Sequence, residues 1–155
     1  MGWLVLAARL VVGGVWIVAG ALKIPDPASS VQAVRAYRLL PEAVVPTVGQ
    51  LLPVVEVVVG LALVVGLLTR TMALASAVLF VAFIIGIASA WARGLTIDCG
   101  CFGGGGYDPD AAEKYPWEIA RDVALLAGSL FVAAVGHRGR WALDHVLFRR
   151  TPLES

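Results

Sequence analysis

Residues 44–68 read VVPTVGQLLPVVEVVVGLALVVGLL, and Glu56 is the only ionisable side chain among them. A helix rises 1.5 Å per residue, so about 20 apolar residues cross the ~30 Å of hydrocarbon in a bilayer. The run Val57-Val58-Val59 does not alternate with polar residues, as the strands of a membrane β-barrel would. Since lipid offers the backbone no hydrogen-bond partner, this stretch predicts a transmembrane helix.

The composition of the whole chain agrees with this prediction. The chain has 155 residues, of which 59% are hydrophobic and 15% are charged, and its mean hydropathy is +0.86. Soluble domains carry about 25% charged residues, so the composition predicts an integral membrane protein in contact with the lipid bilayer. The formal net charge of +1 provides no field that would attract nucleic acid.

Three further apolar segments lie at about residues 3–22, 71–92 and 119–136. Arg121 and Asp122 interrupt the last of them. Together with residues 44–68 they predict an all-α fold, a four-helix transmembrane bundle over residues 1–136. We also expect a short amphipathic helix at the interface between the first two spans, beginning at Ser29 or Ser30. The cysteine loop is predicted at 93–117 and a polar, basic tail at 137–155.

The distribution of basic residues does not decide the orientation of this bundle. With four spans, each side of the membrane carries five lysine or arginine residues, so the positive-inside rule gives a tie. One side has Arg70, Arg138, Arg140, Arg149 and Arg150, and the other has Lys23, Arg35, Arg38, Arg93 and Lys114. Small residues at helix-contact spacing, such as Ala82, Gly86 and Ala90, favour close packing either within the bundle or between two copies in a homo-oligomer.

Cys99 and Cys101 are the only cysteines of the chain, and Gly100 separates them. A disulfide between them closes a very small loop, so it removes little entropy from the unfolded chain and would be a poor structural staple. Strain in such a ring raises the reduction potential. The pair is therefore predicted to be a catalytic thiol–disulfide site. The expected supporting residues are Asp98, Gly100, Phe102, Gly103 and Arg121.

A metal site is the alternative interpretation of this pair. Two thiolates suit a soft ion such as Cu(I), whereas zinc requires four ligands. The two histidines, His137 and His145, fall on the other side of the membrane in the predicted topology. A two-coordinate copper site at Cys99 and Cys101 therefore remains open, in a non-enzymatic subunit or assembly factor.

Three charged residues near or within the spans are further candidates. Buried charges in lipid are normally paired or functional, so Arg9 and Glu56 are predicted to form an intramembrane ion pair, either as a clasp or in a proton or quinone path. Arg121 either stabilises a nearby thiolate or extends its charge to the interface. The aromatic residues around the loop are predicted to lie at the interface; they are Trp91, Tyr107, Tyr115 and Trp117.

These motifs resemble those of the MauE proteins of methylamine utilisation, which belong to the wider DoxX-like group of small four-helix membrane proteins. The most specific match is Cys99-Gly100-Cys101-Phe102-Gly103 after the third span. The resemblance covers roughly residues 3–136. The other matching features are Arg9, Gly20 with Lys23, Tyr37 with Leu40-Pro41, Pro53 with Glu56 and Gly60, and Arg93-Gly94.

The resemblance implies a redox-associated protein of the bacterial inner membrane that supports disulfide formation or maturation of an exported partner. It places the cysteine loop on the exoplasmic side, where disulfides persist, and the termini in the cytoplasm. Disulfide oxidases of the DsbB and vitamin K epoxide reductase types use two cysteine pairs, but this chain has one. The resemblance therefore implies that a second molecule, a thioredoxin-fold protein or a quinone, exchanges electrons with the pair.

Overall fold

The computed structural model describes residues 2–136, which form five helices and no strand. They are α1 (Gly2–Lys23), α2 (Pro27–Ala36), α3 (Val45–Val65), α4 (Thr69–Ala92) and α5 (Ala111–Val135). The all-α prediction is confirmed for this part of the chain. The predicted tail at 137–155, with both histidines, lies outside the described residues.

Three of these helices, α1, α3 and α4, are long and apolar enough to cross a membrane. They correspond to the first three predicted spans. The predicted fourth span forms the second part of α5, which is the least hydrophobic of the four long helices. The charges of α5 all lie in its first half, at Glu113, Lys114, Glu118, Arg121 and Asp122.

The long helices pack as two antiparallel pairs, α1 with α3 and α4 with α5. Glycines bring the backbones of the first pair into direct contact. A Cβ atom on Gly13 would lie 2.8 Å from the carbonyl oxygen of Gly60, and one on Gly20 would lie 2.6 Å from that of Pro53. These contacts fix the register of α1 against α3, since side chains larger than hydrogen would separate the helices.

A chain of polar side chains joins the two pairs inside the apolar core. The indole Nε1 of Trp16 on α1 donates to Ser76 Oγ on α4 at 2.7 Å, and Ser76 Oγ is 2.9 Å from Ser129 Oγ on α5. Trp16 also packs against Phe80, with ring centroids 4.4 Å apart. Because buried hydroxyl groups need partners, this chain stabilises one arrangement of α1, α4 and α5.

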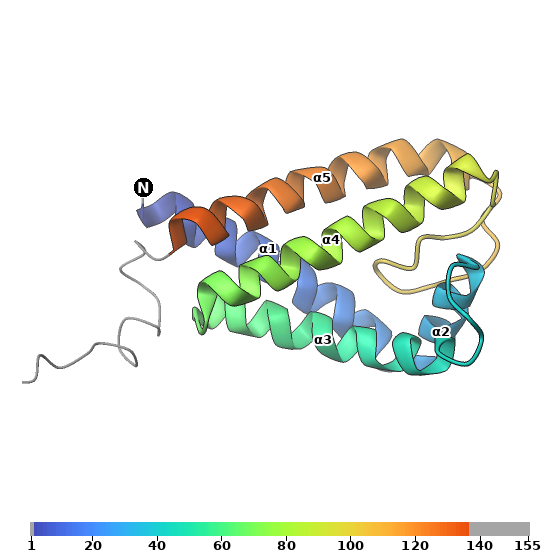
Figure 1. Ribbon diagram of the computed structural model, residues 1–155, viewed down its shortest axis with the longest axis horizontal. Coiled ribbons are helices and arrows are strands. Elements are labelled where there is room, and N and C mark those ends of the chain that lie inside the picture. The colour runs from blue at the N-terminus through green and yellow to red at the C-terminus, as the bar shows by residue number, and fades with distance from the viewer. Residues whose placement is uncertain (1, 137–155) are drawn as a thin grey trace, which may run out of the picture.

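Helices α3 and α4 meet at the short turn between Val65 and Thr69 and then diverge (Figure 1). At the wide end lie α2 and the cysteine loop (Figure 1). Packing between α3 and α4 is therefore less extensive than within either antiparallel pair.

Two predicted boundaries need correction. The cap of α2 is Asp26, whose carboxylate accepts from Ser29 N at 3.1 Å, rather than Ser29 or Ser30. Proline is well tolerated at the first helical position, so α2 begins at Pro27. Helix α5 begins at Ala111 and contains Pro116, so the last residues of the predicted 93–117 loop are helical.

Candidate functional site

The loop that carries the cysteines spans residues 93–110, and its two arms are joined at their base. Asp98 N donates to Gly106 O at 2.9 Å, and Asp108 N donates to Thr96 O at 3.0 Å. These bonds close residues 98–106 into a compact turn. The cysteine motif therefore has a defined backbone conformation.

Tyr115 of α5 attaches this turn to the bundle. Its hydroxyl group donates to Leu95 O at 2.6 Å and accepts from Ile97 N at 3.3 Å, and the residue is 1% exposed. The prediction of an interfacial position is wrong for Tyr115, because its hydroxyl satisfies loop backbone groups that are turned away from water. Tyr107 and Trp117, by contrast, are 79% and 73% exposed.

The two thiols lie side by side and are both free and buried. Cys101 N donates to Cys99 Sγ at 3.4 Å, and Cys101 Sγ donates to Cys99 O at 3.9 Å. The turn between them depends on Gly100, whose φ of +66° is one that L side chains rarely adopt. Asp98 Oδ1 accepts from Gly100 N at 2.8 Å and holds this conformation.

Helix α2 holds the turn from the other side. Ser29 Oγ donates to Gly104 O at 2.8 Å, and Tyr37 OH donates to Cys99 O at 2.8 Å. Gly105 has a φ of +126°, and a Cβ atom there would lie 2.8 Å from Ala33 Cα. Helix α2 therefore positions Cys99 directly, a role that its amphipathic pattern did not reveal.

Glu118 is an ionisable residue near Cys99. The sequence did not identify it as a candidate. Burial raises the pKa of the Glu118 carboxyl, and the neighbouring Cys99 thiol and Arg121 guanidinium lower it by less. Its Oε2 is buried without a partner among the described residues. The available signal was spacing: Glu118, Arg121 and Asp122 lie at positions i, i+3 and i+4, on one helical face.

The Cys99 thiol itself is held in its protonated form. Its hydrogen bond with Cys101 and its burial both raise the pKa of Cys99. A thiol is a much weaker nucleophile than a thiolate. Reaction at Cys99 therefore requires the loss of this proton.

Arg121 lies beside Cys101, as its predicted supporting role requires. Its guanidinium group lies 4.9 Å from the centroid of the Phe102 ring, and its Nη2 is 2.9 Å from Asp122 Oδ1. A small void is bordered by Cys101, Phe102, Arg121 and Asp122. Arg121 and Cys101 thus border the same void.

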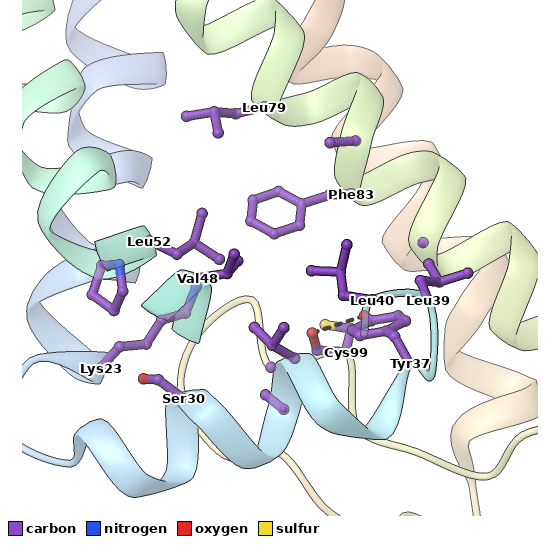
Figure 2. Close-up of a pocket in the computed structure, with 16 residues that line it drawn as sticks. Lys23, Ser30, Tyr37, Leu39, Leu40, Val48, Leu52, Leu79, Phe83 and Cys99 are labelled. Carbon is purple, nitrogen blue, oxygen red and sulfur yellow. Dashed lines mark hydrogen bonds between the residues drawn. The ribbon is translucent and has the colours of Figure 1, made fainter. Parts of the chain in front are cut away.

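A cavity of about 240 Å³ lies between α2, α3 and α4, and Cys99 and Gly100 form part of its wall. Figure 2 shows the ring of Phe83 projecting into it from α4, with Cys99 and Tyr37 at one side and Lys23 at the other. Most of the remaining lining is aliphatic, including Val48, Leu52 and Leu79. A largely apolar cavity thus borders one of the two thiols.

Lys23 and Glu56 form a buried ion pair at this cavity. The Lys23 Nζ lies 2.7 Å from Glu56 Oε1, and the two side chains are 5% and 0% exposed. The predicted pair between Arg9 and Glu56 is therefore wrong. Helical side chains point toward the N-terminus of their own helix, so in antiparallel helices Lys23 and Glu56 approach each other.

Arg9 has a different role, at the other end of α3. Its Nε donates to Leu63 O at 2.9 Å and its Nη2 to Val64 O at 3.3 Å. Both carbonyl groups belong to the last turn of α3, where they lack partners within the helix. A cation there also interacts favourably with the negative end of the helix dipole. Arg9 therefore caps α3.

Within residues 2–136, no group of three or more histidine, cysteine, aspartate or glutamate side chains is arranged to hold a metal ion.

Phe102 is 38% exposed, and Gly103 adopts a φ of +87° in the turn. Of the predicted site, the structure thus brings together Asp98, Gly100, Phe102, Gly103 and Arg121 around the cysteines. It separates Arg9 and Glu56 from each other.

Comparison with known proteins gives the same assignment as the cysteine motif. The model of the family described as methylamine utilisation protein MauE matches residues 1–135. The chain belongs to the MauE family. It is 36% identical over 129 residues to the methylamine utilization protein MauE of Paracoccus denitrificans, a match that covers 82% of this chain and 67% of that protein. No solved structure gives a significant match. With its apolar helices, this MauE family member is a multi-pass membrane protein.

Proposed function

We propose that this protein exchanges disulfides with an exported partner through Cys99 and Cys101. The observation that supports this most directly is the position of the two thiols side by side in a turn that side-chain hydrogen bonds hold in place. Arg121 borders the same void as Cys101, and Glu118 lies near Cys99. The chain has no other cysteine, so the thiol chemistry of the bundle is concentrated in this turn.

The exchange begins with the pair in its disulfide form. A thiolate of the partner attacks Cys99 Sγ, and the Cys99–Cys101 bond breaks. Cys101 leaves as a thiolate that the guanidinium of Arg121 stabilises. A mixed disulfide then joins the partner to Cys99. A second thiolate of the partner attacks the partner's own sulfur in that bond, and Cys99 leaves and takes a proton from Glu118. The partner gains a disulfide, while the pair becomes a dithiol.

The partner we propose is a thioredoxin-fold or other exported redox protein, and the membrane is the bacterial inner membrane. Four spans, with α5 as the fourth, would place the cysteine loop outside the cytoplasm. Two features support this arrangement: α5 packs along α4 and α1, and its charged residues all lie toward the loop end. Disulfides persist on that side of the membrane.

Trapping the mixed disulfide tests the exchange. In a Cys101→Ser variant, Cys99 attacks the disulfide of an oxidised partner in the reverse of the second step, and no Cys101 thiol remains to release the partner, so a covalent complex through Cys99 should accumulate. Mass spectrometry of complexes isolated from membranes under non-reducing conditions identifies the partner. The matched control is the double Cys99→Ser/Cys101→Ser variant. If the single variant yields no more complex than this control, the exchange function is wrong.

Labelling of single cysteines tests the topology. In the double serine background, Tyr107→Cys places a thiol at the exposed loop position, and Leu67→Cys places one in the exposed turn between α3 and α4. A maleimide that does not cross membranes should label the first variant in intact cells and the second only after lysis. The reverse pattern contradicts an exoplasmic loop. Labelling of both in intact cells contradicts an odd number of spans between them.

A further inference from the structure

The cavity beside Cys99 points to the oxidant of the pair. With two cysteines in the whole chain, the pair becomes a dithiol after each exchange and cannot pass its electrons to another cysteine of the same molecule. Something else must accept two electrons and two protons. We infer that a membrane quinone binds in the cavity between α2, α3 and α4 and accepts them. This inference rests on the function proposed above.

The position of the cavity favours a ligand that dissolves in lipid. Its walls include residues of α3 and α4, two helices that diverge toward α2 (Figure 1) and are apolar enough to lie in the membrane. Most of the lining residues are aliphatic or aromatic; they include Leu40, Leu52, Leu79 and Phe83. A hydrophobic molecule can therefore reach Cys99 from the bilayer without crossing the polar loop.

The size of the cavity favours a ring-sized group. Its volume of about 240 Å³ lies below the ~300–1,000 Å³ of sites that enclose whole drug-sized ligands. A quinone ring fits such a space, while its isoprenoid tail extends between α3 and α4 into lipid. Phe83 and Tyr37 line the cavity and present aromatic rings against which a planar ring packs.

Lys23 provides the polar group that a quinone oxygen needs. Its ammonium group is buried in the cavity wall and donates one hydrogen bond, to Glu56, among the described residues. An ammonium group has three donors. A donor directed at a carbonyl oxygen stabilises the negative charge that develops there during reduction. An acyl chain of a lipid would make no use of this buried cation, so the observations favour a quinone over a lipid tail.

The proposed step conserves electrons and protons. The two S–H bonds of Cys99 and Cys101 break, a bond forms between the two sulfurs, and two electrons pass to the quinone. Glu118 takes the proton of Cys99, and both protons finally reside on the quinol oxygens. The dithiol is oxidised, the quinone is reduced, and the disulfide that the partner consumes is restored.

The test uses the full-length protein, reduced and purified in detergent without oxygen. A benzoquinone with a short alkyl tail is added, its absorbance is followed, and the mass of the intact protein is measured. We expect quinone loss matched by loss of two hydrogen masses from the protein, and neither in the Cys99→Ser/Cys101→Ser variant. A mass gain equal to one quinone would show simple addition to a thiol and would overturn the inference.

Two matched variants locate the reaction. Ala82 lines the cavity and Ala88 lies further along α4 by about 1.7 turns, and both are exposed. The rate for Ala82→Phe should fall at least about tenfold, because the added ring occupies the quinone space, while Ala88→Phe should react as the wild type does. Equal rates in the two variants would overturn the cavity as the quinone site and leave a lipid tail as its occupant.

Trapping of the partner separates the two proposals. If a Cys101→Ser protein captures a partner while the wild type fails to react with quinone, the exchange function stands and the quinone inference is wrong. If quinone oxidises the pair and no partner is captured, the exchange function is wrong, although the cavity does bind quinone.

Discussion

The ammonium of Lys23 and the carboxylate of Glu56 meet 2.7 Å apart between α1 and α3, in a part of the bundle where both side chains are buried. The contact joins the end of one apolar helix to the middle of another. Glu56 Oε2 has no partner among the described residues. The pair is thus joined by a single hydrogen bond, and its Lys23 side chain lines the cavity.

Replacing one member of the Lys23–Glu56 pair should destabilise the fold more than replacing both. Lys23→Met leaves a carboxylate buried without a cation, which typically costs about 3–5 kcal/mol, whereas replacing both members by apolar residues is often close to neutral. We therefore expect the melting temperature in detergent to fall in Lys23→Met and to recover in Lys23→Met/Glu56→Leu. If the double variant melts no higher than the single one, the two residues are not coupled.

Glu118→Gln should slow the reaction of the reduced pair with a disulfide probe by about 10²-fold, the lower range for general acid–base groups. In the wild type the rate should rise with pH through the pKa of Glu118, which burial places above its usual value. The glutamine variant should lose this part of the pH profile. A profile unchanged by the substitution would contradict proton transfer to Glu118.

The same substitution should not harm stability. Since burial raises the pKa of Glu118 in the folded protein, the protonated carboxyl stabilises the fold at pH values below its unfolded pKa. This contribution is lost as pH rises through the folded pKa. At neutral pH the neutral amide of Glu118→Gln should therefore melt at or above the wild-type temperature. A lower melting temperature would indicate that the carboxylate supports the structure.

Gly105→Ala should loosen the cysteine turn. Its φ of +126° and the 2.8 Å approach of a Cβ atom to Ala33 Cα leave no room for a methyl group, and such strain costs about 1–3 kcal/mol. We expect faster alkylation of both thiols, because the turn separates from α2. The matched control is Gly106→Ala, where a Cβ atom meets nothing within 4 Å. Equal alkylation rates in the two variants would contradict this packing.

Tyr115→Phe should destabilise the same turn by another route. Loss of the hydroxyl group leaves Ile97 N and Leu95 O without their partner, and a buried group without a partner costs about 1–3 kcal/mol. The melting temperature should fall. Tyr107→Phe is the control, because Tyr107 is 79% exposed and should melt as the wild type does. A similar fall in both variants would contradict the attachment described here.

The helices that cross the membrane could be predicted from the sequence because apolar length alone defines them. The first three predicted spans differ from α1, α3 and α4 by at most a few residues. The proximity of the two cysteines could be predicted equally well, since two cysteines separated by one glycine are close together in any fold. Both features are local, and neither depends on how the helices pack.

Contacts between helices could not be predicted in the same way. Pairing Arg9 with Glu56 assumed a register that the contacts of Gly13 with Gly60 do not allow. Glu118 was overlooked because the loop was expected to continue to residue 117, which hid the helical spacing to Arg121. Tyr115 and Tyr107 look alike in the sequence, and only the folded loop separates a buried structural residue from an exposed one.

The arrangement of the long helices as two tightly packed pairs has an evolutionary consequence. The residues that keep each pair together, such as Gly13 and Gly60, lie away from the gap between α3 and α4. Mutations that reshape the gap therefore leave the supporting contacts intact. Natural variation can thus change the shape of this cavity at little risk to folding.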